Sequence, residues 1–512
     1  MKDYMKLQNG SDIRGIALPG VPGENVNLTP EAAGRIAVGF LKWLCDKTGK
    51  QTEDITISIG RDPRLSGPAI AEAFAEGVAR CGVRLLDCGI ASTPAMFMST
   101  LFKETDADGA VMITASHLPW NRNGLKFFSK DGGLDKADIK QILETAGSDF
   151  EFPIGGAKAV EFPELMNRYA GHLRTIITEA MVKADAAVQF DKPLAGLKIA
   201  VDAGNGSGGF YANKVLAPLG ADVSASRYLD PDGNFPNHIP NPENDEAMRA
   251  ITEATLEGGC DLGLIFDTDV DRSSAVDEKG REINKNGIVA LAAALIADEY
   301  PGSTVVTDSI TSNELTDYLE NKLGMKHLRF KRGYRNVINK AIELNAAGVD
   351  SQLAIETSGH AAYKGNYFLD DGAYLATLIV IRTALLKQVG LGISSVIADL
   401  KEPAEAVEIR MPITVEDFKT AGDTALEKVR AAVASGAAAV DGLALEIVEP
   451  NYEGIRVAVS GSVNGWFLLR KSLHDPIMPL NIEAQEVGGI DVIRGVIRKC
   501  FEGVEGVDTA KL

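Results

Sequence analysis

Short apolar runs alternate with longer segments of helical periodicity from the start of the chain to about Lys401. The run at 55–62, ITISIGRD, has the β-branched residues of a buried strand, and 67–82 after it has the periodicity of a helix. The same alternation then returns several times along the chain. The segments that we expect to contain strands are 55–62, 84–90, 109–117, 197–209, 221–229, 261–269, 303–312, 326–335 and 352–360.

Strands that alternate with helices at this spacing indicate α/β units. After Lys401 the pattern changes to more closely spaced strands, with helices near 415–434 and 488–502. We therefore expect an α/β fold: three similar α/β domains with mixed, mostly parallel sheets, plus a smaller C-terminal α+β domain, around a central cleft. The expected domains are 1–190, 191–301, 302–402 and 403–512.

Composition narrows the function classes. The chain has 512 residues, a formal net charge of -19 and five cysteines without a C-x-x-C pair. The negative charge argues against nucleic acid or an anionic membrane as a partner, and the scattered cysteines favour free thiols in a reducing compartment. The apolar run 288–297 is too short to span a bilayer. We expect a cytoplasmic monomer or weak dimer, or an organellar protein if a transit peptide precedes this sequence.

The most informative polar cluster is LGLIFDTDVDR at 262–272, where three aspartates at alternate positions follow an apolar strand. In an extended segment Asp267, Asp269 and Asp271 would point the same way, and such close carboxylates repel unless a cation lies between them. Oxygen ligands of this kind favour Mg²⁺. A solvated acidic turn is the alternative. A calcium loop is excluded because Arg272 stands where that turn needs glycine.

A second cluster, TASHLPWNRNGLK, spans 114–126. Ser116 follows a buried strand, His117 is its neighbour, and Lys126 comes just after the turn signal Asn-Gly. A hydroxyl at a strand end beside cations suits a phosphoryl carrier, although a Ser/His pair that merely closes a turn fits the same residues. A serine-protease triad is disfavoured, since no G-x-S-x-G elbow is present and the serine and histidine are adjacent.

Three further clusters are weak alone. ETSGH at 356–360 offers Glu356 and Ser358 for sugar hydroxyls and His360 for proton transfer or phosphate contact, but a helix start explains it equally well. LLRKSLHDP at 468–476 carries Arg470 and Ser472, and an arginine fork matches phosphate oxygens. Near the start, GSDIRG contains Arg14, for which a surface turn is the default interpretation.

Taken together and in this order, the clusters resemble the α-D-phosphohexomutase family, which includes phosphoglucomutase/phosphomannomutase and phosphoglucosamine mutase. The resemblance covers nearly the whole chain, and the ordered set TASH-x-P, NG-x-K, D-x-D-x-D-R, E-x-SGH and R-x-S is far more specific than any one motif.

The resemblance implies a role for each cluster. Ser116 would be the phosphoserine and would hold Mg²⁺ together with Asp267, Asp269 and Asp271. Lys126 and Arg14 would flank the phosphoryl group, with His117 in the same loop, Arg272 near the metal and His360 as an acid/base candidate. Substrate contacts would come from Gly333, Tyr334, Arg335, Glu356 and Ser358 at the sugar, and from Arg470, Ser472 and His474 in the phosphate loop.

The implied reaction interconverts hexose 1-phosphate and hexose 6-phosphate, of glucose or mannose, through the phosphoserine. A hexose 1,6-bisphosphate serves as intermediate and activator, and the partner is a small-molecule sugar phosphate. Two alternatives stay open: a non-catalytic paralogue that binds a sugar phosphate or a protein, and a dehalogenase-like phosphotransferase that uses Asp267 as nucleophile, with Asp370 and Asp371 as its distal acidic pair.

The chain also departs from the family pattern. Leu118 stands where the family usually has asparagine after Ser-His. The phosphate loop usually reads R-x-S-N/G-T-E-P with a further arginine, whereas this chain has Leu473, His474, Asp475 and, at the position expected for that arginine, Pro479. Lys471 and His474 are the candidates to replace the missing donors.

Overall fold

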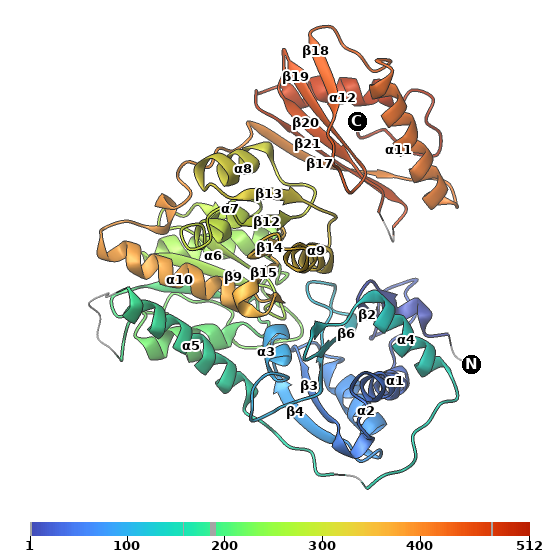
Figure 1. The fold of residues 1–512 in the computed structure, drawn as a ribbon, viewed down its shortest axis with the longest axis vertical. Helices are drawn as coiled ribbons and strands as arrows, with labels where there is room; N and C mark the ends of the chain where they lie inside the picture. Colours follow the sequence, from blue (N-terminus) through green and yellow to red (C-terminus); the bar gives the residue numbers. More distant parts are fainter. Residues whose placement is uncertain (1–2, 157, 185–190, 473–474) are drawn as a thin grey trace. The chain divides into compact units, whose positions relative to one another are not determined.

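The computed structural model describes residues 3–156, 158–184, 191–472 and 475–512. The fold consists of three α/β segments with mixed sheets and a C-terminal β-rich segment, as the sequence predicts (Figure 1). Tertiary contacts divide the chain into two compact units. The first contains Met1–Asp298 and Gln352–Ala398, and the second contains Glu299–Ser351 and Asp399–Leu512. The predicted third domain, 302–402, is therefore shared between them.

The first sheet of the first unit has the strand order β1-β2-β6-β5-β3-β4, with β7 beside β6. β3 pairs in parallel with β4 and β5, whereas β6 lies between β2 and β5 and is antiparallel to both. The strands are β1 Gln8–Asn9, β2 Asp12–Ile16, β3 Thr56–Arg61, β4 Arg84–Ile90, β5 Gly109–Ile113, β6 Arg122–Ser129 and β7 Gly132–Gly133. The helices are α1 Pro30–Thr48, α2 Gly67–Ala79, α3 Thr93–Met98, α4 Lys136–Gly147 and α5 Leu165–Lys183, with short 3₁₀ turns at Met5–Leu7 and Thr52–Asp54.

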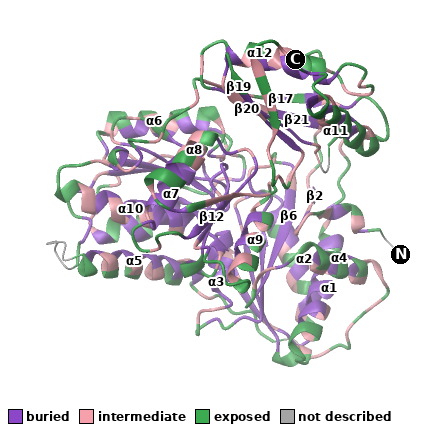
Figure 2. Ribbon diagram, turned by 45° about the horizontal axis from the view of Figure 1, so that its top comes forward, coloured by how far each residue is buried: buried purple, intermediate pink, exposed green. Residues whose placement is uncertain are grey.

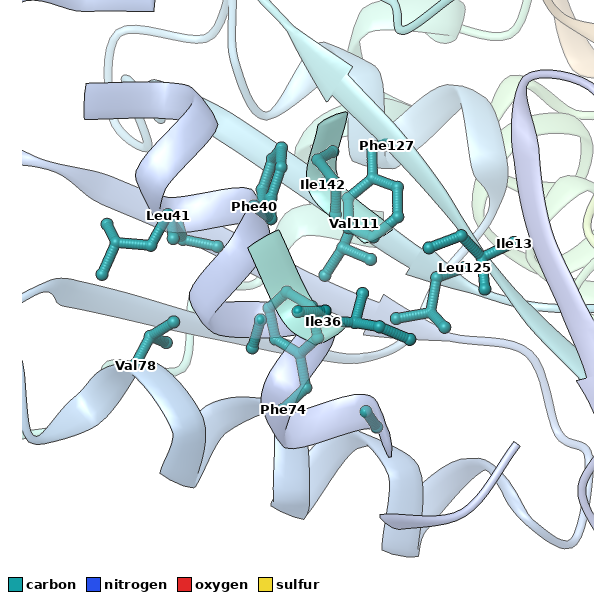
Figure 3. Close-up of a cluster of buried hydrophobic side chains, with 14 of the residues drawn as sticks. Ile13, Ile36, Phe40, Leu41, Phe74, Val78, Val111, Leu125, Phe127 and Ile142 are labelled. Atoms are coloured by element: carbon teal, nitrogen blue, oxygen red, sulfur yellow. The ribbon is translucent and has the colours of Figure 1, made fainter. Parts of the chain in front are cut away.

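Local signals fix both ends of α1. The Thr29 side chain accepts a hydrogen bond from the backbone N–H of Ala32, Pro30 occupies the first turn, and Gly49 ends α1 in the left-handed conformation. Buried and exposed residues recur along α5 at helical spacing, whereas α1 is buried over most of its length and exposed only at its ends (Figure 2). The buried face of α1 packs on the sheet, where the rings of Phe40 and Phe127 lie 4.7 Å apart (Figure 3).

The second segment of this unit has the strand order β11-β10-β9-β8, with β8 and β9 parallel. Its elements are β8 Ile199–Asp202, β9 Leu262–Phe266, β10 Ser273–Val276, β11 Glu282–Ile283, α6 Asp245–Gly258 and α7 Asn286–Ala294, with a π-helical turn at Tyr211–Leu216 and a 3₁₀ turn at Ala217–Leu219. Residues 352–398 contribute β14 Leu353–Ile355, β15 Ala361–Tyr363, β16 Leu369–Asp370 and α10 Gly372–Gln388, with 3₁₀ turns at Lys364–Asn366 and Ile393–Ser395.

The predicted strand at 221–229 is wrong. Only isolated parallel bridges form there, between Asp222 and Lys198 and between Arg227 and Asp202. The Asp222 side chain accepts the backbone N–H of Ser224, which turns the chain away from the sheet between the two bridges.

The second unit contains a parallel pair of strands and an antiparallel sheet of order β17-β21-β20-β19-β18. Its elements are β12 Thr304–Thr307, β13 Lys326–Arg329, α8 Asn313–Asp317, α9 Tyr334–Ala346, β17 Glu405–Pro412, α11 Phe418–Ala434, β18 Leu443–Ile447, β19 Ile455–Gly461, β20 Gly465–Leu469, β21 Ile477–Ala484 and α12 Gly489–Cys500, with a π-helical turn at Tyr318–Lys322. The internal strand β21 was not among the predicted strands, and it contains Pro479, a residue that is unusual inside a sheet. In the structure the Pro479 carbonyl accepts the N–H of Arg470.

All five cysteines are free thiols, as predicted. Among the helices in the described ranges, none is both long and apolar enough to cross a membrane.

Candidate active site

Ser116 lies just beyond β5 and is 3% exposed. Its φ angle of 49° is in the left-handed region, which a non-glycine residue adopts only when its surroundings hold it there. The Ser116 Oγ donates to Asp267 Oδ2 at 2.9 Å and accepts from Arg272 Nη2 at 3.1 Å. The structure therefore brings the predicted phosphoryl carrier to the aspartate cluster, although 151 residues separate Ser116 from Asp267 in sequence.

The three aspartates converge, but not as an extended strand. Val270 has φ 67°, and its N–H donates to the Asp267 carbonyl at 3.4 Å, so a tight turn follows β9. Carboxylate oxygens of Asp267, Asp269 and Asp271 all lie within 4.8 Å of one another. The prediction of convergence is thus confirmed, while the extended geometry from which we argued it is wrong.

The donor set fits a hard cation. Oδ1 of Asp269 and Oδ1 of Asp271 are buried without a hydrogen-bond partner in the described structure, which is costly unless a positive charge satisfies them. Burial raises the pKa of Asp267 well above its usual range, and repulsion from Asp271 and Asp269 adds to this effect. The three carboxylates therefore call for additional positive charge.

Part of that charge comes from Lys126, which β6 presents beside β5 because it is the register partner of Met112. Its Nζ lies 2.9 Å from Asp269 Oδ2 and also forms an ion pair with Asp271. Burial alone would raise the pKa of Asp271, but Lys126, His360 and Arg272 outweigh it and hold that pKa below its usual value. Asp271 is thus held in its anionic form, the form that binds a cation.

His117 and Arg272 complete the surroundings of Ser116. The Arg272 Nη2 atom lies 2.7 Å from His117 Nδ1, and the guanidinium is 1% exposed. Burial lowers the pKa of His117 to about 2, and the positive charge of Arg272 contributes to this shift. His117 is therefore a neutral hydrogen-bonding group at physiological pH.

His360 reaches the cluster from the loop after β14. Its Nδ1 lies 2.6 Å from Asp370 Oδ2 and 3.8 Å from Asp271 Oδ1. Burial disfavours the charged imidazolium, but Asp370 and Asp271 more than compensate and raise the pKa of His360 to about 9. A protonated His360 can donate a proton or neutralise a phosphate.

Two glycines allow this close approach. A Cβ atom on Gly359 would lie 2.6 Å from the Ser273 carbonyl oxygen, and one on Gly372 would lie 2.5 Å from the Arg272 carbonyl carbon. The loop between β14 and β15 and the start of α10 therefore rest directly on the backbone that follows the aspartates. A larger side chain at either position would push the loops apart.

The remaining predicted residues of the first unit occupy the same loops and strands. Glu356 and Ser358 are buried in the loop that follows β14, and the Glu356 N–H donates to the His360 carbonyl at 2.9 Å. Arg14 lies on β2 opposite Gly124 of β6, with its Nη2 3.0 Å from Asp12 Oδ2. Its charge also lowers the pKa of His117.

The other predicted substrate contacts belong to the second unit. Gly333 caps the N-terminus of α9 with φ 110°, and Tyr334 and Arg335 form the first residues of that helix. Arg470 follows β20 and is 6% exposed. Ser472 accepts the N–H of Asp475 at 3.1 Å. His474 lies outside the described residues.

Lys471, a candidate to replace the missing donors, pairs through its Nζ with Asp423 Oδ1 on α11 at 2.5 Å. Pro479, which stands where the family's further arginine is expected, lies within β21.

Sequence reasoning missed Thr93 at the site. Its hydroxyl donates to Asp269 Oδ2 at 2.5 Å, and its N–H donates to the Asp269 carbonyl at 2.8 Å. The signal was present, because Ser92-Thr93-Pro94 is a helix start directly after β4. The dehalogenase-like interpretation loses its acidic pair, since Asp370 holds His360 and Asp371 caps α10 through the N–H of Tyr374.

Comparison with known proteins decides the family. Models of the phosphoglucomutase/phosphomannomutase α/β/α domains I, II and III match residues 5–151, 168–280 and 284–402 respectively. The chain belongs to the α-D-phosphohexomutase family. It is therefore an enzyme, an isomerase of the intramolecular phosphotransferase type.

Individual relatives agree with the family match. The chain is 28% identical over 451 residues to a phosphomannomutase/phosphoglucomutase of Pseudomonas aeruginosa, and 88% of each chain is covered. It is 29% identical over 448 residues to a phosphoglucomutase of Neisseria gonorrhoeae, with 87% of this chain and 88% of that protein covered. The crystal structure of a phosphoglucomutase/phosphomannomutase family protein from Burkholderia thailandensis superposes with a TM-score of 0.76 at 25% identity, over 97% of each chain.

Proposed function

We propose that this phosphohexomutase interconverts the 1-phosphate and 6-phosphate of glucose, mannose or both through a phosphorylated Ser116. The observation that carries the proposal is the 2.9 Å contact between Ser116 Oγ and Asp267, inside a cluster that also contains Lys126. A buried hydroxyl next to metal-ligand carboxylates and a lysine suits reversible phosphoryl transfer, in which positioning and charge neutralisation supply most of the catalysis.

In the proposed cycle, phosphoserine 116 gives its phosphoryl group to the free hydroxyl of a hexose monophosphate. The bond from phosphorus to Ser116 Oγ breaks and the bond to the sugar oxygen forms. The sugar hydroxyl gives its proton to water, and the departing Oγ takes up a proton. The resulting hexose 1,6-bisphosphate reorients and returns its other phosphoryl group to Ser116. His360 is the proton donor to the departing oxygen, and by microscopic reversibility it accepts the proton in the opposite direction.

The proposed metal is Mg²⁺, which Asp267, Asp269, Asp271 and the phosphorylated Ser116 would hold. When bound, it would neutralise the charge of the phosphoryl oxygens. Lys126, Arg14 and Arg272 provide the fixed positive charge around the same group, and Thr93 orients Asp269.

Recognition of the sugar phosphate is assigned to two further sets of residues. Glu356 and Ser358 would bind the sugar hydroxyls, together with Gly333, Tyr334 and Arg335. Arg470 and Ser472 would bind the phosphate that does not react, with the same roles for either orientation of the sugar.

The test is to incubate the protein with Mg²⁺ and glucose 1,6-bisphosphate, and to map the phosphorylated residue by mass spectrometry. Phosphate on Ser116, with turnover of glucose 1-phosphate or mannose 1-phosphate, is the expected result. Phosphate on Asp267 would replace this mechanism with the dehalogenase-like one. An unlabelled protein without turnover would leave only sugar-phosphate binding.

A further inference from the structure

Arg64 uses four of the five N–H groups of its guanidinium on the segment that carries Ser116. The side chain is 1% exposed and follows the carboxyl end of β3, next to β5. A guanidinium has five N–H donors in one plane, and here each has an acceptor. Four of them reach main-chain carbonyls: Pro119 at 2.9 Å, Arg122 at 3.2 Å, Leu118 at 2.7 Å and Ser116.

The fifth donor connects to a second line of contacts. Arg64 Nε donates to Asp62 Oδ2 at 3.2 Å, and the same oxygen accepts the Thr114 hydroxyl at 2.7 Å. The Thr114 Oγ1 in turn accepts the N–H of Ser116 at 2.9 Å. Arg64 therefore holds the carbonyl of Ser116 directly, and Asp62 holds its N–H through Thr114.

These two lines explain how Ser116 keeps its left-handed backbone. A non-glycine residue is strained in that region, so it needs contacts that fix both sides of it. The four contacts that Arg64 makes with this segment go to main-chain carbonyls, so they do not depend on which side chains the segment carries. Leu118, which departs from the family's asparagine, still has its carbonyl fixed at 2.7 Å.

We propose that Arg64 is a positioning residue for phosphoryl transfer, which acts with Asp62 and Thr114 to fix the main chain of Ser116 so that its Oγ points at Asp267. The proposal rests on the proposed function, since it requires Ser116 as the phosphoryl carrier. A lysine at position 64 would keep the charge but offers three donors in a tetrahedral arrangement, which cannot reach the same acceptors.

The experiment compares Arg64→Lys with Arg35→Lys. Arg35 is a matched control in the same segment, because its guanidinium also donates to main-chain carbonyls, those of Ala146, Ser148 and Phe150. For each protein we would measure the rate of Ser116 phosphorylation by glucose 1,6-bisphosphate, kcat and KM for glucose 1-phosphate, and the thermal unfolding midpoint.

We expect Arg64→Lys to lower both the phosphorylation rate and kcat by about 100-fold, the cost of misplacing a reacting atom by about 1 Å, while KM changes little. Arg35→Lys should leave both rates close to wild type. Equal loss in the two variants, or wild-type phosphorylation of a folded Arg64→Lys protein, would overturn the proposal. A wild-type protein without phosphate on Ser116 would instead overturn the proposed function and, with it, this role for Arg64.

A second pair of variants covers the case in which Arg64→Lys fails to fold. Thr114→Val keeps the side-chain shape but removes the acceptor for the Ser116 N–H, whereas Thr114→Ser retains the hydroxyl. The phosphorylation rate should fall by about tenfold or more in Thr114→Val and recover in Thr114→Ser, because one hydrogen bond to a buried group is worth about 1–3 kcal/mol. Equal phosphorylation rates in these two variants would show that the hydrogen bond from the Ser116 N–H to Thr114 does not help to position Ser116.

Discussion

The loops around Ser116 in the first unit and the surroundings of Arg470 in the second unit are built in different ways. Asp267 and Asp269 are fully buried, and the side chains around them bond to one another or to main-chain atoms at short distances. Arg470 is also buried, yet its Nε has no hydrogen-bond partner in the described structure, and its Nη1 lies 3.9 Å from Glu453 Oε1.

This contrast matches two different tasks. Groups that stabilise a reacting phosphoryl must be in position before the reaction, because their reorganisation would otherwise add to the barrier. A group that only recognises a phosphate can keep donors in reserve until the phosphate arrives. We therefore expect substitutions in the first region to lower kcat and those in the second to raise KM.

The largest effect is expected for Ser116→Ala, which removes the proposed phosphoryl carrier. The kcat for glucose 1-phosphate should fall by at least about 10⁴-fold, as for other covalent nucleophiles. Ser472→Ala is the control from the second region, and it should change KM and leave kcat within about threefold. A coupled assay of glucose 6-phosphate formation measures both, and normal turnover of the Ser116→Ala protein would refute the carrier role.

Asp269→Asn should follow, with a loss of kcat of about 100-fold or more. The substitution removes one carboxylate charge from the buried cluster while keeping the shape of the side chain, so affinity for a divalent cation should weaken. Titration of Mn²⁺ by calorimetry would show this, and EDTA should abolish wild-type activity until Mg²⁺ is restored. Asp106→Asn is the control, because Asp106 pairs with Lys130 in a solvent-exposed position; a similar loss there would argue against a local effect on metal binding.

Arg470→Ala should raise KM by about 10- to 100-fold and change kcat by less than about threefold, since a bidentate contact with a phosphate contributes binding in ground state and transition state alike. The KM of Arg470→Lys should lie between the KM of the wild type and that of Arg470→Ala. Arg430→Ala is the control, because it removes a half-exposed arginine of α11 that pairs with Glu449 in the same unit. The KM of this variant should match that of the wild type. A fall in kcat with unchanged KM for Arg470→Ala would mean that the contrast between the regions is false.

The smallest effect on catalysis is expected for Arg456→Lys in the second unit. Arg456 stacks 3.6 Å above the ring of Trp466 and donates to the carbonyls of Ser309 and Thr311, each at 3.1 Å. Loss of this stack and of the planar donors should lower the free energy of unfolding by about 1–3 kcal/mol while kcat stays within about twofold. Denaturant unfolding followed by tryptophan fluorescence measures the change, and an unaltered midpoint would show that the stack carries no stability.

Local sequence signals accounted for most of the fold. The caps at Thr29 and Asp371, the apolar runs of β5 and β9, and the polar clusters at their ends were all readable from neighbouring residues. The prediction of a strand at 221–229 failed because strand propensity takes no account of the turn in which the Asp222 side chain accepts the N–H of Ser224.

The candidate site was predictable where a motif carries its own chemistry, and not where a residue acts on a distant loop. Arg64 reads as an ordinary surface-type arginine after a strand, since its acceptors lie 52 to 58 residues away and are main-chain carbonyls that no side-chain pattern reveals. Thr93 is likewise separated from Asp269 by 176 residues. Such contacts arise from the pairing of strands, which a single sequence does not specify.

The discontinuous first unit has a consequence for biosynthesis. A ribosome releases the aspartate turn long before His360, and the whole of 299–351, which belongs to the other unit, is made in between. Until then the carbonyl of Val270 lacks the N–H of Gly372, and Tyr211 lacks the hydroxyl of Thr377 that lies 3.0 Å from its own. The loops that contain Val270 and Tyr211 can therefore reach their native contacts only after residues 352–398 have been synthesised. A fragment that ends at Asp298 would lack these contacts.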